Sequence, residues 1–176
     1  HSIRRHIERL ISEGPVGINE MAEVQANRDS RLGEAFAPHM IEALSKAELW
    51  RAQLTDGALL TPTQQRAASL WEGEQERLAS LKGYLEGWRE GGYQASSGVE
   101  TFYHPTVDET ERRDAVATMI FNEALRVLLE LVWADEAAES MPVDGARLRV
   151  YALERMLRDR GSERAVGLSS WREETG

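Results

Sequence analysis

Six arginines stand close together in the last helical part of the sequence: Arg147, Arg149, Arg155, Arg158, Arg160 and Arg164. A guanidinium group binds a small planar oxyanion through two parallel hydrogen bonds, and does so most strongly where water is excluded. Acidic residues are interspersed among them, namely Asp144, Glu154, Asp159 and Glu163. The segment is therefore a candidate anion site, and its alternative interpretation is a solvated helix face held by ion pairs.

Part of this segment resembles a known family of sensor domains. Residues 158–167 read Arg-Asp-Arg-Gly-Ser-Glu-Arg-Ala-Val-Gly, which is similar to strings in the nitrate- and nitrite-sensing helical domains of bacterial transmembrane receptors. Near the start of the chain, Glu13-Gly14-Pro15 with Asn19 resembles a Glu-Arg-Gly-Pro motif of extracytoplasmic sensor bundles, without its arginine. The resemblance implies an all-helical periplasmic sensor domain between two membrane spans, in which arginines recognise an anion.

The same resemblance gives ligand-binding or structural roles to Arg158, Arg160 and Arg164. The chain begins at His1 rather than Met, so we expect a fragment of a longer protein whose membrane spans lie outside it. We expect such a sensor domain to be periplasmic, and a chain that is no sensor fragment to be cytoplasmic.

Metal binding is not predicted. The four histidines are scattered over three segments as His1, His6, His39 and His104. None stands in the Glu-x-x-His spacing that di-iron helical bundles use. Two glutamates, Glu123 and Glu130, lie two turns apart in one apolar helical segment. We expect them to face solvent or to pair with arginines, because glutamate is rarely buried without a partner.

Catalysis is not predicted either. One polar segment holds Ser96, Ser97, Tyr103 and His104, but a serine nucleophile needs a base and a third group that orients the base, and nothing identifies them. No phosphate-binding glycine loop of the Gly-x-x-x-x-Gly-Lys-Ser/Thr type is present. Residues 79–83, Ala-Ser-Leu-Lys-Gly, are similar to a phosphotransfer pattern, with alanine in the histidine position. We predict neither catalytic residues nor a cofactor.

Composition limits the class of protein. The 176 residues are 41% hydrophobic and 29% charged, without cysteine, and the net charge is −9. These values fit one folded domain. An acidic chain repels polyphosphate, so no nucleic-acid partner is predicted. No apolar run reaches the roughly 18 residues that a membrane span needs.

Hydrophobic spacing predicts an all-α bundle of five to seven helices in a single domain, residues 1–176. The expected helices cover residues 2–13, from 18 onward, 38–57, 61–90, 106–139 and 144–161, with a long loop at 91–105 and an irregular tail at 165–176. Sustained alternation of apolar and polar residues is absent, so strands are not expected.

Two of the expected helices begin with a capping-box sequence, Thr61 with Gln64 and Thr106 with Glu109. In the helix after Thr61, apolar residues recur every seven positions and predict a packing seam, and Gly73, Gly83 and Gly87 permit close helix contact or a bend. Pro38 is expected to open its helix. The helix after Thr106 is the most apolar, and is expected to be central in the core.

These observations favour a sensory or small-ligand-binding bundle of a bacterial signal-transduction protein, with a small anion as ligand. The alternative is a protein interaction bundle without a small ligand, monomeric or homodimeric, for which Trp171 in the tail is a candidate anchor. An enzyme with an unrecognised site is a third alternative.

Overall fold

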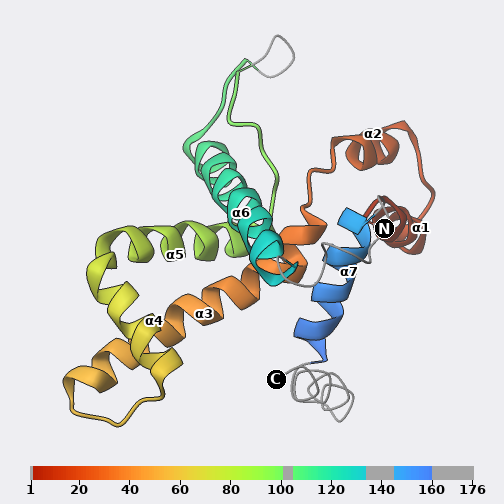
Figure 1. The fold of residues 1–176 in the computed structure, drawn as a ribbon. Helices are drawn as coiled ribbons and strands as arrows, with labels where there is room; N and C mark the ends of the chain where they lie inside the picture. Colours follow the sequence, from red (N-terminus) through yellow and green to blue (C-terminus); the bar gives the residue numbers. More distant parts are fainter. Residues whose placement is uncertain (1, 101–104, 134–144, 160–176) are drawn as a thin grey trace. The chain divides into compact units, whose positions relative to one another are not determined.

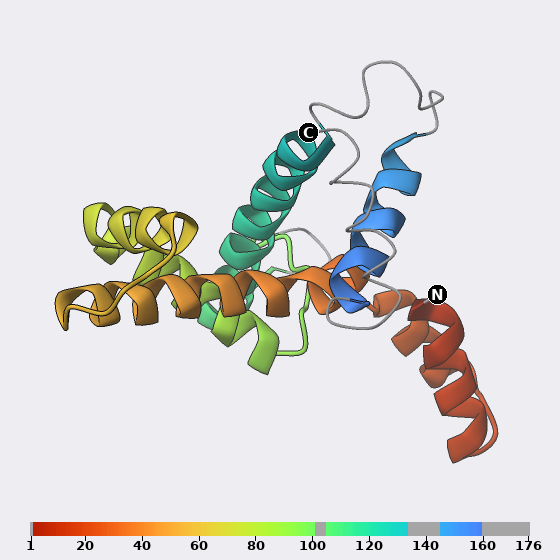
Figure 2. The same ribbon diagram turned by 60° about the horizontal axis from the view of Figure 1, so that its bottom comes forward.

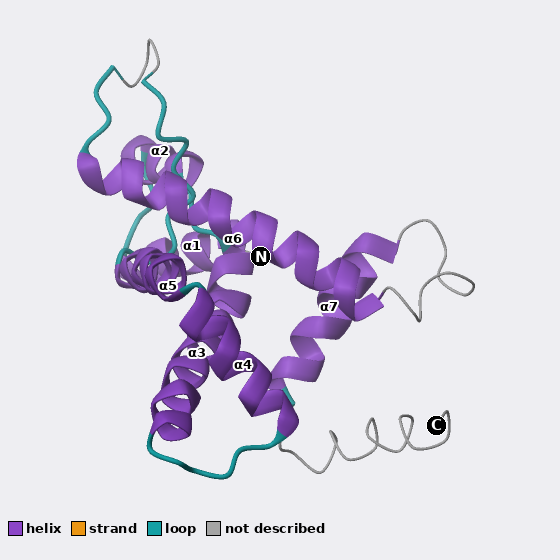
Figure 3. Ribbon diagram, turned by 60° about the vertical axis from the view of Figure 1, so that its left-hand side comes forward, coloured by secondary structure: helices purple, strands orange, loops and turns teal. Residues whose placement is uncertain are grey.

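The computed structural model describes residues 2–100, 105–133 and 145–159. These residues form seven helices: α1 (Ser2–Glu13), α2 (Ile18–Ala26), α3 (Arg31–Thr55), α4 (Pro62–Gly73), α5 (Gln75–Glu90), α6 (Glu109–Trp133) and α7 (Gly145–Arg158). In the described ranges the helices are joined by loops (Figures 1 and 3). One isolated antiparallel bridge pairs Asp29 with Gln94. The predicted all-α bundle is confirmed.

The chain divides into two compact units, His1–Phe121 and Asn122–Gly176. The helix α6 begins in the first unit and ends in the second. The prediction of a single domain stays a prediction, and the expected irregular tail lies outside the described residues. None of the helices in the described ranges has the length and apolar content to cross a bilayer.

The helix α1 covers the first predicted segment and ends before Gly14, whose φ of +152° lies outside the range that side chains readily adopt. The helix α2 starts beside Gly17, whose amide donates to the Glu20 carboxylate over 2.8 Å. Each of these short helices buries one large apolar residue, Leu10 in α1 and Val24 in α2. Both helices begin at the residues that were predicted from the sequence.

The helix α3 starts earlier than predicted, at Arg31 rather than Pro38. Ser30 is the N-cap, because its Oγ accepts from the Gly33 amide at 3.0 Å. Pro38 therefore lies inside the helix, where it removes one hydrogen bond to the carbonyl of Glu34. The helix ends at Thr55, before Gly57 in a left-handed conformation.

The predicted helix at residues 61–90 is two helices that meet at Glu74. Its capping box is confirmed, since the Thr61 amide donates to Gln64 Oε1 at 2.8 Å and the Gln64 amide donates to Thr61 Oγ1 at 3.4 Å. The bend follows directly after Gly73, where the sequence allowed one. Three residues of the predicted seam, Trp71, Leu85 and Trp88, are buried, whereas its other two members, Leu78 and Leu81, are half-buried.

The helix α3 has the central place in the first unit that was expected of α6. Both α4 and α5 pack against α3 (Figure 2), and α3 buries Phe36, Ala37 and Ile41. Leu49 and Leu54, further along α3, are exposed. In α6, Ala117 and Phe121 are fully buried, whereas Met119 is 65% exposed.

The capping box of α6 is shifted by two residues from the prediction. The Glu111 amide donates to Asp108 Oδ1 at 2.8 Å, and the Asp108 amide donates to Glu111 Oε2 at 3.4 Å. Aspartate is a better N-cap than threonine, so Asp108 rather than Thr106 starts the helix. Further along α6, Arg126 pairs with both Glu123 and Glu130, which confirms the expected arginine pairing.

Candidate functional site

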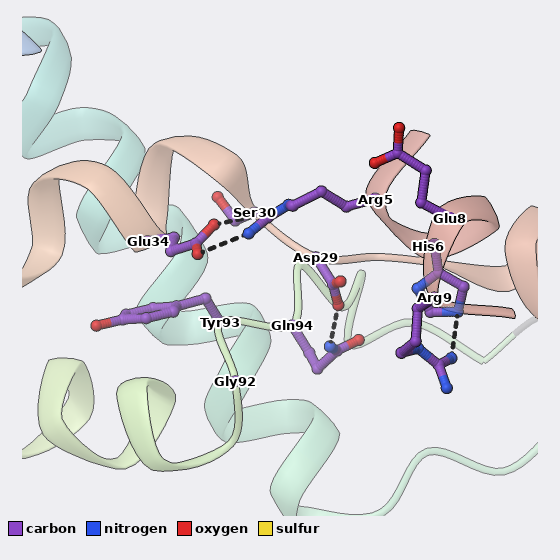
Figure 4. Close-up of a pocket in the computed structure, with 10 residues that line it drawn as sticks. All are labelled: Arg5, His6, Glu8, Arg9, Asp29, Ser30, Glu34, Gly92, Tyr93 and Gln94. Carbon is purple, nitrogen blue, oxygen red and sulfur yellow. Dashed lines mark hydrogen bonds and ion pairs between the residues drawn. The ribbon is translucent and has the colours of Figure 1, made fainter. Parts of the chain in front are cut away.

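The first unit contains a polar recess of about 680 Å³ that is open to solvent (Figure 4). Three segments far apart in the sequence line it: the helix α1, residues 29–34 and residues 92–94. Its lining residues are Arg5, His6, Glu8, Arg9, Asp29, Ser30, Glu34, Gly92, Tyr93 and Gln94. Because most of these side chains are charged or polar, the recess suits a charged, water-soluble ligand.

The base of the recess is a short antiparallel pairing between residues 28–30 and 93–95. The Ser30 amide donates to the Tyr93 carbonyl at 2.9 Å, and the Ala95 amide donates to the Arg28 carbonyl at 2.7 Å. The Gln94 side-chain amide donates to the Asp29 carboxylate (Figure 4). This pairing fixes the start of α3 against the segment that follows α5.

Tyr93 forms one wall in an unusual backbone conformation. Its φ of 60° is left-handed, which is rare for a bulky residue. The conformation is held on both sides, because the Tyr93 amide donates to the Trp88 carbonyl at 2.9 Å while the Tyr93 carbonyl accepts from Ser30. Burial raises the pKa of the Tyr93 hydroxyl, so this group stays a neutral hydrogen-bonding group near neutral pH.

Trp88 supports the recess from the core. Its indole Nε1 donates to the Gln94 carbonyl at 2.8 Å, and its ring meets Tyr93 edge to face at 5.3 Å between centroids. A Cβ added to Gly33 would lie 2.5 Å from the Trp88 ring, so the close approach of α3 requires glycine. On the side of α6, the ring lies 5.2 Å from Phe121.

An ion pair joins α1 to α3 at the recess. The Arg5 guanidinium donates to both carboxylate oxygens of Glu34, over 3.1 and 2.8 Å (Figure 4). Arg31 donates to the same carboxylate at 2.9 Å. The hydrogen bond from Arg5, aided by Arg31 and opposed by partial burial, lowers the pKa of Glu34 to about 2. The carboxylate therefore has two cationic partners.

A second polar chain runs along the other side of the recess. The Asn27 amide group donates to Asp29 Oδ2 at 2.9 Å, and its nitrogen lies 3.0 Å from His6 Nδ1. The other ring nitrogen, His6 Nε2, lies 3.1 Å from Arg9 Nη2 (Figure 4). Arg9 also donates to both oxygens of Glu13 at 3.0 Å. These contacts place Arg9 and His6 side by side.

The arginines predicted as ligand-binding residues do not line this recess. Arg158 lies at the end of α7, where it is exposed and its Nε is 3.7 Å from Asp159 Oδ1. Arg155 lies 4.0 Å from the same carboxylate. Arg160 and Arg164 lie outside the described residues. The pairing with Asp159 matches the alternative of a solvated ion-paired face at this end of α7.

Arg149 differs from the other arginines of α7. Its side chain is half-buried, and its Nε is fully sequestered without a hydrogen-bond partner among the described residues. A buried donor without an acceptor costs free energy and is often matched by a bound water or ion. Arg149 is therefore the residue of this helix whose surroundings best suit an anion.

Sequence reasoning did not identify the recess. Arg5 and Arg9 stand one helical turn apart in the first expected helix, residues 2–13. Their spacing was the one available signal, because the other two lining segments reach the site only through the fold. In the described ranges, no group of acidic and histidine side chains could hold a metal ion.

No family model, curated protein or solved structure matches this chain.

Proposed function

We propose that this chain is a small-anion-binding sensory bundle of a bacterial signal-transduction protein, and that the recess beside α1 is its ligand site. One observation carries the proposal: Arg5, which lines the recess, shares the Glu34 carboxylate with Arg31. Because the Arg5–Glu34 pair is bidentate, the guanidinium already has the geometry that binds a ligand carboxylate or another planar oxyanion.

An arriving anion can take the place of Glu34 at moderate cost. If Arg5 turns to the ligand, Glu34 keeps its hydrogen bond to Arg31 and is not left without a cation. The Glu34 side chain is 43% exposed, so water can satisfy its other oxygen. An exchange of partners of this kind loosens the ion pair between α1 and α3, and so couples ligand binding to the position of a helix.

The recess also has a physical link to α6. Tyr93 and Gln94 line it and contact Trp88, and Trp88 packs on Phe121. The helix α6 continues past Phe121 into the second unit. A ligand that shifts Tyr93 would therefore act on a continuous helix that leaves the first unit, as signal transfer requires.

Calorimetric titration with acetate and with nitrate tests the proposal. Wild-type protein should bind at least one of them, and Arg5→Ala should remove the binding. Arg77→Ala is the matched control, because Arg77 forms an exposed pair with Glu74 elsewhere on the surface and should bind as wild type does. Absence of binding by the wild type overturns the proposal.

A second set of variants separates the recess from the arginine-rich helix. If the anion is held by α7 and the residues that follow it, Arg149→Ala, or the combined change of Arg158, Arg160 and Arg164 to alanine, should remove binding while Arg5→Ala retains it. Loss in Arg5→Ala alone assigns the ligand to the recess.

A protein interaction bundle is the second candidate function. It is supported by three large apolar side chains on the outside of α7, where Leu148, Tyr151 and Met156 are 52%, 55% and 42% exposed. Such side chains are common anchors for partner proteins. The other proposed anchor, Trp171, lies outside the described residues. A solution mass of twice the chain mass, lost in a variant with Leu148→Glu and Tyr151→Glu, would favour a homodimer.

A further inference from the structure

We propose that the second unit carries a dimer interface, in which the outer face of α7 in one copy of the chain packs antiparallel against the outer face of α6 in a second copy. This inference rests on the second candidate function, a homodimer, and is independent of the anion site. It follows from the apolar side chains that these helices expose, from their spacing, and from the opposite charges of the two faces.

In the described part of the second unit, more large apolar side chains are exposed than are buried, the rest being half-buried. The buried ones are Leu125, Trp133 and Leu153. The exposed ones, between 38% and 71% exposed, are Val127, Leu131, Leu148, Tyr151 and Met156. Apolar side chains gathered in this way on the outside of two helices are typical of a surface that a protein partner covers.

The outer face of α7 is a stripe of two apolar residues followed by two arginines. Leu148, Tyr151, Arg155 and Arg158 succeed one another at spacings of three, four and three residues, which places them on one side of the helix. The two apolar residues are 52% and 55% exposed, and the two arginine side chains 50% and 60%. The stripe is therefore apolar near the start of α7 and basic near its end.

The basic end of the stripe has hydrogen-bonding capacity for an acidic partner. Arg155 and Arg158 both approach Asp159, with Nε–Oδ distances of 4.0 and 3.7 Å, which are longer than hydrogen bonds. The whole helix has four arginines and one glutamate, in a chain of net charge −9. A second copy of this chain thus offers acidic surface to a basic helix.

The outer face of α6 has the matching residues in the opposite order. Glu123, Val127, Glu130 and Leu131 lie on one side of the helix, at spacings of four, three and one residues. The two glutamate side chains are 63% and 64% exposed, Val127 is 38% exposed and Leu131 is 71% exposed. Read backward from the end of α6, this face begins with an apolar residue and ends with an acidic one.

An antiparallel pairing of the two faces joins apolar to apolar and basic to acidic residues. With Leu148 opposite Leu131, the seven positions to Arg155 correspond closely to the eight positions back to Glu123, since both helices rise about 1.5 Å per residue. Tyr151 then lies at the apolar end of both faces. A parallel pairing would instead place Leu148 beside Glu123.

Glu123 can accept Arg155 of a second copy while it keeps its present partner. Arg126 donates to both Glu123 and Glu130, so these three side chains together have one negative charge in excess. A carboxylate accepts up to about four hydrogen bonds. In a dimer with twofold symmetry the contact occurs twice, once in each direction, and the assembly closes without further copies.

Sedimentation equilibrium of the full chain over a range of concentrations, combined with charge reversals, tests the inference. The wild type should form a dimer that dissociates on dilution. Arg155→Glu and Glu123→Arg should each weaken the dimer by about tenfold or more, because like charges then face each other. An equimolar mixture of the two variants should restore the dimer, because each of its two contacts again joins opposite charges.

The outcomes separate this inference from the homodimer on which it rests. If Leu148→Glu with Tyr151→Glu dissociates the dimer, but the charge reversals leave it unchanged or their mixture stays monomeric, the homodimer stands and the pairing of α7 with α6 is wrong. If the wild type is monomeric at every concentration, both are wrong, and a different protein is left as the occupant of the face.

Arg66→Glu is the matched control, because it makes the same charge change at an exposed position of α4 in the first unit. This variant should dimerise as the wild type does, and an equal loss there would overturn the assignment of the interface to the second unit. An unchanged far-ultraviolet circular dichroism spectrum of each variant verifies folding.

Discussion

Two carboxylates of the first unit have opposite surroundings. Glu34, at the recess, is partly exposed and receives hydrogen bonds from two arginines, which lower its pKa to about 2. Asp114, on α6, is only 6% exposed, and no hydrogen bond or ion pair joins it to a described residue. Burial, followed by the nearby charges of Asp108 and Glu111, raises the pKa of Asp114, with Arg113 opposing.

The surroundings of Asp114 explain why its carboxylate lacks partners. The segment that follows α5 lies tightly against α6, so that a Cβ on Gly98 would be 2.6 Å from the Cβ of Ala115. Ser96, in the same segment, is also buried. At Gly91 an added Cβ would lie 3.6 Å from Asp114 Oδ1, so the end of α5 also lies close to this carboxylate.

The difference distinguishes an adjustable site from a packed one. The carboxylate of Glu34 has two cationic partners and access to water, so it can exchange one partner at small cost. The side chain of Asp114 is buried and has no hydrogen bond or ion pair with a described residue, so its charge is expected to oppose folding near neutral pH. Function is expected where partners can be exchanged, and stability is limited where a charge is buried without one.

The change with the largest expected effect is Trp88→Ala, because Trp88 is the support shared by the recess and α6. Removing a fully buried tryptophan should lower the free energy of unfolding by about 3–5 kcal/mol, and the recess should lose its wall at Tyr93. Urea unfolding followed by circular dichroism measures the change. Trp50→Ala, at a half-buried position of α3, is the control, and an equal loss there would contradict the special role of Trp88.

Asp114→Asn should have the next largest effect, and in the opposite direction. Removing a buried charge that lacks partners should raise the free energy of unfolding near neutral pH by about 1–3 kcal/mol. Because the pKa of Asp114 is raised in the folded state, wild-type stability should fall as the pH rises from the ordinary aspartate value of about 3.9 through the folded-state pKa. The asparagine variant should lack this fall.

Urea unfolding of the wild type and the variant across this pH range measures the effect. Glu130→Gln, at an exposed position of the same helix, is the control, and it should keep the fall in stability. A variant Asp114→Asn that is less stable than wild type near neutral pH would show that the carboxylate has favourable interactions after all.

Local signals in the sequence were sufficient where one short-range contact decides the structure. The Thr61–Gln64 capping box is such a case, because both hydrogen bonds join residues three apart. Two overlapping boxes at Thr106 and Asp108 needed a ranking of cap residues as well. At α3, the residue three positions after Ser30 is Gly33 rather than a glutamate or glutamine, so the sequence has no capping box there. Pro38 was therefore the stronger start signal for this helix.

The recess could not be predicted in this way, because it depends on contacts between distant segments. Arg5 meets Glu34 across 29 positions, and Gln94 meets Asp29 across 65. The left-handed conformation of Tyr93 also has no sequence signal, since glycine or asparagine usually takes that conformation. The sequence also gave no signal for the role of Gly33, because the need for a glycine there follows from its close contact with the Trp88 ring.

Glu34→Gln should have the smallest effect on stability and should sharpen the contrast with Asp114. The ion pairs of Glu34 are exposed, so their loss should cost about 0.5–1 kcal/mol at most near neutral pH. The lowered pKa means that this contribution is complete above the ordinary glutamate value of about 4.3 and is lost as the pH falls toward about 2.

The same variant should strengthen anion binding, because Arg5 no longer has to leave a charged partner. Unfolding measured from neutral to acid pH, together with titration with acetate, tests both effects in one protein. The two carboxylates then give opposite results: neutralising Asp114 raises stability without changing acetate affinity, and neutralising Glu34 raises acetate affinity while stability falls slightly. A Glu34→Gln protein that binds acetate more weakly than wild type would mean that Glu34 positions Arg5 for the ligand rather than competing with it.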